Sequence, residues 1–125
     1  FLDMAWHTIT SPVTSDIEEF ESAATGLTEI FPPIHDINIS VSFAHIFGGG
    51  YASGYYGYKW AETLDADAFN YLKGKGVFNR AIMTSFRKNI LEKGGCDNPM
   101  SLYRNFRGQE PTIDAFLERS GLTHS

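Results

Sequence analysis

The residues best suited to chemistry lie in one short stretch, from His45 to Tyr58. Gly48–Gly50 permits positive φ values and close backbone approach, which suits a hinge or a loop that presents N–H groups to a ligand. A phenol is neutral at pH 7 and donates a hydrogen bond without carrying a full charge. Tyr51, Tyr55 and Tyr58 beside an imidazole would suit stabilisation of a developing oxyanion. The alternative is that these tyrosines form aromatic core with satisfied hydroxyls.

The sequence lacks the common motifs for phosphate and zinc binding. No Gly-Lys-Ser/Thr follows the glycine run, so it is not a P-loop, and it does not match the dinucleotide-binding GxGxxG. There is no HExxH and no Cys/His cluster, so we expect no zinc site formed by this chain alone. We expect no bound cofactor in the isolated chain for the same reason.

The remaining reactive side chains have structural interpretations. We expect His7 at a helix end or in the core, and His124 in a frayed tail. His35 and Asp36 are adjacent and form a local hydrogen-bonded pair in this interpretation. Cys96 is the single cysteine, so it forms no internal disulfide, and we expect a passive loop thiol. The arginines of the C-terminal helices are expected to be solvated or ion-paired: Arg104, Arg107 and Arg119.

Composition bounds the class of protein. The 125 residues are 42% hydrophobic and 20% charged, which predicts one ordinary domain over 1–125 and excludes a disordered tail. The net charge of −5 argues against nucleic-acid binding, which needs a basic face. The longest run without Asp, Glu, Lys or Arg, 37–58, is rich in Gly, Ser and Tyr and is no membrane span. A single cysteine fits a reducing compartment, and no leader is visible. Because the chain begins at Phe1, we expect a piece of a longer protein.

Helical periodicity and capping residues predict an all-α fold of short helices with a long Gly/Pro-rich loop. Ser15 and Glu18 form a capping box for a helix at 15–25 that ends at Gly26. Residues 27–50 then form a long irregular connection, and residues 1–9 end an apolar segment.

The second half of the chain is expected to be mostly helical. A helix over 51–73 would place Tyr51, Tyr55, Tyr58, Glu62 and Asp65 on one face and Tyr56, Trp60, Leu64 and Tyr71 on the other. Further helices are predicted at 80–93, capped by Asn79 and closed by Gly94, after Asn98-Pro99, and from Pro111 to Gly121. The last helix would bury Ile113, Phe116 and Leu117.

Several segments together resemble the thimet-oligopeptidase family of zinc metallopeptidases. The longest is SFAHIFGGGYASGYYGYKWAETLDADAF at 42–69. The others are LDMAWHT at 2–8, GVFNR at 76–80, ILEKGG at 90–95 and FRGQEPTIDAFL at 106–117. The resemblance covers nearly the whole chain in order, and it implies a largely helical zincin-type catalytic domain that hydrolyses peptide bonds.

The same resemblance implies roles for the residues between His45 and Tyr58. His45 matches a catalytic histidine that contacts substrate near the scissile carbonyl. Tyr51 matches a tyrosine at the end of a flexible loop, containing Gly49 and Gly50, that closes onto the peptide. Tyr58 matches the tyrosine that supports the oxyanion, and Tyr55 matches a secondary substrate contact.

The zinc ligands of that family, an HExxH helix and a further Glu, lie upstream of the matched segment and are absent from this chain. The resemblance therefore implies the C-terminal, substrate-clamping part of a cytoplasmic oligopeptidase or peptidyl-dipeptidase, which is inactive without the missing N-terminal part. Its substrates would be short peptides, with zinc bound in the intact enzyme. Apolar surfaces such as Trp60/Leu64 or Trp6 would lose their cover, so the fragment is expected to self-associate. The alternative is a stand-alone, non-catalytic helical module that binds peptides or a partner.

Overall fold

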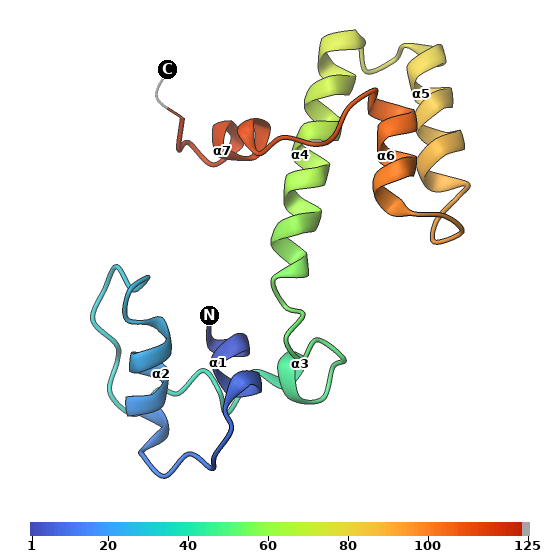
Figure 1. Cartoon of the computed structure of the whole chain (residues 1–125). Coiled ribbons are helices and arrows are strands. Elements are labelled where there is room, and N and C mark those ends of the chain that lie inside the picture. Colours follow the sequence, from blue (N-terminus) through green and yellow to red (C-terminus); the bar gives the residue numbers. More distant parts are fainter. Residues whose placement is uncertain (124–125) are drawn as a thin grey trace. The chain divides into compact units, whose positions relative to one another are not determined.

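A computed structural model describes residues 1–123, and all the regular secondary structure in these residues is helical. Seven α-helices and one π-helix form in this part of the chain, and no strand does, which confirms the all-α prediction (Figure 1). The chain divides into two compact units, Phe1–Gly57 and Tyr58–Ser125, which are described separately. A single domain over 1–125 stays a prediction.

The first unit contains α1 (Leu2–Thr8), α2 (Ile17–Thr25) and α3 (Ala44–Phe47). Helices α1 and α2 pack through Trp6 and Phe20, whose ring centroids are 4.1 Å apart. The predicted capping box at 15–18 is wrong by one residue. The side chain of Asp16 accepts the N–H of Glu18 and starts the helix at Ile17, because a carboxylate at the N-cap satisfies a free N–H group.

The irregular connection after α2 is held by a buried carboxylate. Glu21 is 8% exposed, and its oxygens accept the N–H groups of Ile39 at 2.9 Å and Ser40 at 2.6 Å. The Trp6 indole donates to the Ser40 hydroxyl at 2.7 Å. The predicted irregular segment is therefore confirmed, apart from α3. Hydrogen bonds connect it to Trp6 of α1 and to Glu21 of α2.

The predicted helix over 51–73 is wrong at its start. Helix α4 spans Gly57–Lys75, and residues 51–56 form successive turns closed by Gly54 N–H to Tyr51 O and Gly57 N–H to Gly54 O. Ser53 has a φ of 55°, a left-handed value that does not continue a right-handed helix. Tyr51 and Tyr55 therefore do not share a helical face with Tyr58.

The second unit contains α4, α5 (Arg80–Phe86), the π-helix η1 (Arg87–Leu91), α6 (Pro99–Arg107) and α7 (Asp114–Arg119). The Asn79 side chain accepts from two N–H groups at the start of α5, and Asn98 caps α6 with proline at its first position. The predicted Asn79 cap and the predicted helix start at Asn98-Pro99 are both confirmed. The predicted helix 80–93 is instead an α-helix followed by a π-helix that ends at Leu91.

Aromatic rings and one buried carboxylate form the centre of the second unit. Phe106 packs edge-on against Tyr71, Phe86 and Tyr103, with centroid distances of 5.4, 5.1 and 6.1 Å. Asp67 is 2% exposed and accepts from the Tyr103 hydroxyl at 2.5 Å and from Arg107 Nε at 3.1 Å. Burial, and then the hydrogen bond and charge of Asp67, raise the pKa of Tyr103. Arg107 is thus ion-paired, as predicted.

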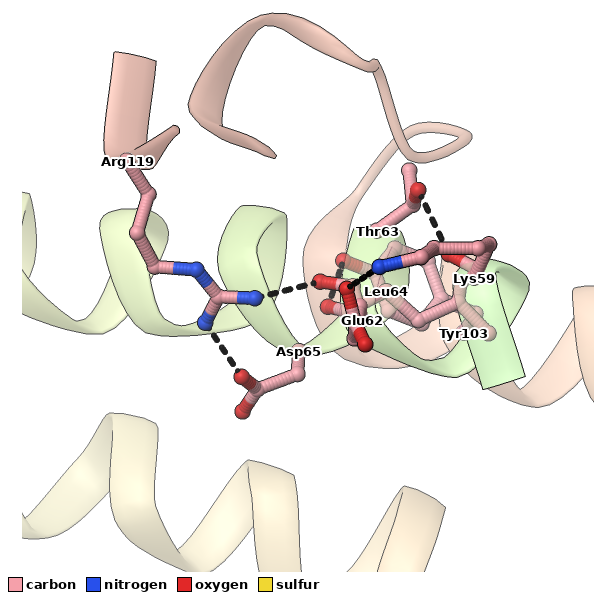
Figure 2. Close-up of polar contacts among 7 residues, drawn as sticks. All are labelled: Lys59, Glu62, Thr63, Leu64, Asp65, Tyr103 and Arg119. Carbon is pink, nitrogen blue, oxygen red and sulfur yellow. Dashed lines mark hydrogen bonds and ion pairs between the residues drawn. The ribbon is translucent and has the colours of Figure 1, made fainter. Parts of the chain in front are cut away.

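Helix α7 is fastened to α4 by Arg119, as Figure 2 shows. Arg119 donates to the Asp65 carboxylate at 2.6 Å and to the Glu62 carbonyl at 3.1 Å. The helix begins at Asp114 rather than Pro111, and Ala115 is its buried residue, whereas Ile113 is 53% exposed. The prediction that Ile113 is buried is therefore wrong. Arg104 pairs with Glu110, so all three arginines are ion-paired, which is one of the two states expected for them.

Large apolar side chains stand exposed in both units. Trp60 is 56% exposed, as predicted, whereas Trp6 and Leu64 are half-buried. Several apolar residues elsewhere are more exposed: Leu27, Ile30, Phe31 and Phe78 are 103%, 88%, 81% and 99% exposed. Cys96 is exposed in a turn. None of the described helices is both long enough and apolar enough to cross a membrane.

Candidate functional site

One imidazole and two phenol rings gather in the first unit. His45 lies on α3, whose neighbouring Ile46 is 1% exposed and anchors the short helix while the histidine stays exposed. The His45 ring centroid is 6.0 Å from that of Tyr51 and 6.1 Å from that of Tyr55. The two tyrosine centroids are 6.4 Å apart. The structure thus brings together three of the four predicted side chains, which we call the His45 cluster (His45, Tyr51 and Tyr55).

The glycine run bends the chain so that Tyr51 returns to His45. The His45 carbonyl accepts the N–H groups of Gly49 at 3.2 Å and Tyr51 at 3.3 Å. A Cβ on Gly49 would lie 2.9 Å from both the Cα and the carbonyl oxygen of His45, which real side chains do not tolerate. Gly50 has a φ of 78°, which favours glycine. The turn therefore requires glycine at both positions.

A buried carboxylate of α1 fixes the turns that carry the tyrosines. Asp3 is 6% exposed; its Oδ1 accepts the N–H of Ser53 and its Oδ2 that of Tyr55, both at 2.9 Å. His7 Nδ1 lies 2.9 Å from Asp3 Oδ1. Burial raises the pKa of Asp3. The N–H groups of Tyr55 and Ser53, together with His7, lower it by more, so the pKa lies below its ordinary value.

Asp3 was missed by the sequence-based search for functional residues. The signal was present in LDMAWHT, where an acid and a histidine are four residues apart and so share a helix face. His7 lies at the end of α1, as predicted. What the sequence does not reveal is that the carboxylate binds backbone fifty residues further along the chain.

Tyr58 lies in the first turn of α4, in the second unit, and is 43% exposed. Tyr51 is 38% exposed, and Tyr55 is half-buried against the edge of Phe43 at 4.6 Å. Tyr51 and Tyr58 are therefore at the surface of the described chain, and Tyr55 is partly covered. The catalytic role of Tyr58 stays a prediction.

The residues of the His45 cluster do not fit a catalytic zinc, which takes three protein ligands from nitrogen, sulfur or carboxylate groups. They supply one imidazole and neutral phenols. Among residues 1–123, one group offers three potential metal ligands: Glu18, His35 and Asp36, at the surface. The His35 side chain is 82% exposed and lies 3.1 Å from Glu18 and 3.8 Å from Asp36, so the predicted local pair gains a second acid. His124 lies outside the described residues.

Comparison with known proteins places this chain. The sequence model of Peptidase family M3 matches residues 1–122, which takes in α1, the glycine turn and every element of the second unit. The chain belongs to peptidase family M3. The resemblance inferred from LDMAWHT and the segment 42–69 is therefore confirmed, and so is its helical architecture.

Relatives of this M3 chain carry two kinds of peptidase name. Oligopeptidase A of Escherichia coli strain K12 is 53% identical over 81 residues, 65% of this chain and 12% of that protein. The probable cytosolic oligopeptidase A of Arabidopsis thaliana is 38% identical over 126 residues, which cover 97% of this chain and 18% of that protein. Dipeptidyl carboxypeptidase of Salmonella typhimurium is 38% identical over 123 residues, also 97% and 18%. The M3 chain thus spans less than a fifth of the length of these relatives.

The two buried carboxylates of the first unit predict that its stability falls on acidification. Burial raises the pKa of Glu21, but its hydrogen bonds from Ser40 and Ile39 lower it more, to below the ordinary 4.5, and the pKa of Asp3 lies below 3.8. A folded-state pKa below the unfolded value gives stability that is present above the unfolded pKa and is lost as pH falls through the folded one. Urea unfolding followed from pH 7 to pH 2.5 should therefore show stability declining below about pH 4.5.

Asp3→Asn and Glu21→Gln are the variants for this measurement. Each should be less stable than the parent chain at pH 7, and the difference should shrink as the pH approaches 3. Stability curves that stay parallel down to pH 2.5 would contradict the assignment.

Proposed function

We propose that this chain is the C-terminal, substrate-clamping part of the catalytic domain of an M3 oligopeptidase or peptidyl-dipeptidase. The observation that carries the proposal is the His45 cluster, held by a glycine turn and by Asp3 within a chain that matches the M3 family over 1–122. The names of the relatives, oligopeptidase A and dipeptidyl carboxypeptidase, support peptide-bond hydrolysis. Names of both kinds occur among the relatives, so the proposal covers endopeptidase and dipeptide-releasing activities alike.

The chemistry proposed for these residues is hydrogen bonding to the substrate by neutral donors. Tyr51 and Tyr55 would grip the peptide, with Gly49 and Gly50 as the hinge of the loop that closes on it, and His45 would contact it near the scissile carbonyl. Tyr58 would donate its phenol hydrogen to the carbonyl oxygen as that oxygen gains negative charge. A donor of this kind contributes most in the transition state, because the charge there is largest.

The zinc of the intact enzyme is assigned to residues outside this chain. Two features support this assignment: the chain contains no HExxH, and the His45 cluster offers one imidazole. We therefore propose that the chain alone is inactive. Its partners would be the rest of the M3 catalytic domain and short peptide substrates. A cytoplasmic location is supported by the single cysteine, which is unpaired, and by the name of the Arabidopsis relative.

The isolated chain is expected to self-associate, because apolar residues that the rest of the domain would cover are exposed. Ile30 and Phe31 are 88% and 81% exposed in the loop after α2. Light scattering of the 125-residue chain should show species larger than a monomer as concentration rises, and Ile30→Ser with Phe31→Ser should reduce them. A chain that stays monomeric at high concentration would argue against the proposal.

The experiment that tests the proposed function uses the full-length protein that contains this chain. It should cleave short peptides and lose that activity to a zinc chelator. Tyr58→Phe should then lower kcat about a hundredfold or more while KM changes little, since the lost donor acts mainly in the transition state. Steady-state kinetics on a peptide series measure both constants.

Tyr56→Phe is the matched control, because Tyr56 is 61% exposed and has no assigned role. Its kinetics should equal those of the parent protein. An unchanged kcat in Tyr58→Phe would remove the oxyanion role from that residue. A full-length protein that binds peptides without cleaving them would favour the alternative, a non-catalytic binding module.

Gly49→Val tests the glycine turn in the same protein. A side chain at this position collides with the His45 backbone, so His45 and Tyr51 should separate and kcat/KM should fall about tenfold or more. Gly48→Ala is the control, because a Cβ at Gly48 lies 3.7 Å from its nearest neighbour, an ordinary contact. Kinetics of Gly49→Val equal to those of the control would count against the turn.

A further inference from the structure

We propose that Asp3 is a positioning residue that holds the two substrate-gripping tyrosines in place, a role that rests on the proposed function. Each carboxylate oxygen of Asp3 accepts one backbone N–H, from Ser53 and from Tyr55, and both distances are 2.9 Å. The carboxylate therefore grips the turns at two points, fifty and fifty-two residues away along the chain, and restrains both their position and their orientation.

Without the Asp3 carboxylate, the turns at 51–56 would lose two of their hydrogen bonds. Residues 51–56 are in neither a helix nor a strand, and the backbone bonds within them are few. Ser53 has a φ of 55°, which a serine adopts at a cost in energy that the surrounding contacts must offset. Charge-assisted hydrogen bonds to a carboxylate are about twice as strong as neutral ones. Asp3 thus supplies two strong hydrogen bonds to this strained segment.

Tyr55 connects Asp3 to the His45 cluster. The Tyr55 N–H binds Asp3 while its ring lies 6.1 Å from His45 and 6.4 Å from Tyr51. A displacement of the Tyr55 backbone therefore moves one of the three rings directly. Because the cluster is assigned to gripping the peptide, loss of the anchor should weaken substrate binding and raise KM, unlike loss of the Tyr58 hydroxyl.

The first unit provides a matched control in Glu21. This second buried carboxylate is 8% exposed, against 6% for Asp3, and it also accepts two backbone N–H groups. Those groups belong to Ile39 and Ser40, in the other irregular segment. Asp3→Asn and Glu21→Gln therefore remove equivalent interactions, and a purely structural role for Asp3 predicts equal effects on catalysis.

The test uses the full-length protein, at a temperature well below the unfolding transitions of both variants. Asp3→Asn should raise KM for short peptides at least tenfold and change kcat less than threefold, whereas Glu21→Gln should leave both constants within twofold of the parent. Equal KM values for the two variants would overturn the proposal. If Asp3→Asn does not fold, Asp3→Glu replaces it, with Glu21→Asp as control; the displaced carboxylate should raise KM about threefold, and an unchanged KM would overturn the proposal.

Hydrogen exchange separates this proposal from the proposed function. In Asp3→Asn, the amides of 51–57 should exchange at least tenfold faster than in the parent, whereas in Glu21→Gln the acceleration should be confined to 37–42. A parent protein that cleaves no peptide would refute the proposed function, and faster exchange at 51–57 would still support Asp3 as the anchor of the turns. Unchanged exchange at 51–57 would overturn the anchor whether or not peptides are cleaved.

Discussion

A carboxylate buried in a folded protein must find donors, and the first unit of this chain is organised around that requirement. Asp3 and Glu21 are each less than a tenth exposed, and each accepts two backbone N–H groups from an irregular segment. Segments without regular structure otherwise leave such groups unpaired, which is costly when they are buried. The apolar centre of this unit is small: its buried apolar residues are Leu2 and Ile46, at 6% and 1% exposure. Charge-assisted hydrogen bonds, rather than apolar burial, therefore give the unit its defined loops.

The second unit uses the same principle in a more conventional setting. Asp67 is buried among aromatic rings, and its partners are the side chains of Tyr103 and Arg107 rather than the backbone. The Arg107 guanidinium also stacks on Tyr71 at 4.6 Å, so a single cation serves both the acid and the ring. Removing one partner of such a buried pair costs about 3–5 kcal/mol, because the other charge is left without compensation. The Asp67 carboxylate thereby connects α4 to α6.

Local features were predictable from the sequence, and features set by distant contacts were not. The Asn79 and Asn98 caps depend on atoms two or three residues away, so the sequence pattern identified them. The turns at 51–56 bind Asp3, which is remote in sequence, and periodicity alone therefore extended the predicted helix back to Tyr51. The grouping of Tyr51 and Tyr55 was predicted correctly from a helical face that does not exist. It arises instead from a turn, because Gly49 and Gly50 allow the chain to fold back onto His45.

The use of a turn rather than a helix has a physical consequence for the His45 cluster. Side chains on one helix are held by the hydrogen bonds of that helix, whereas Tyr51 and Tyr55 lie on turns whose position is set by contacts with other parts of the first unit. Neutral donors are effective only when their distance to the substrate is controlled, since they have no full charge to act over a longer range. A turn that carries phenols therefore needs its backbone held in place. Asp3 meets this need by accepting the backbone N–H groups of Ser53 and Tyr55, one with each carboxylate oxygen.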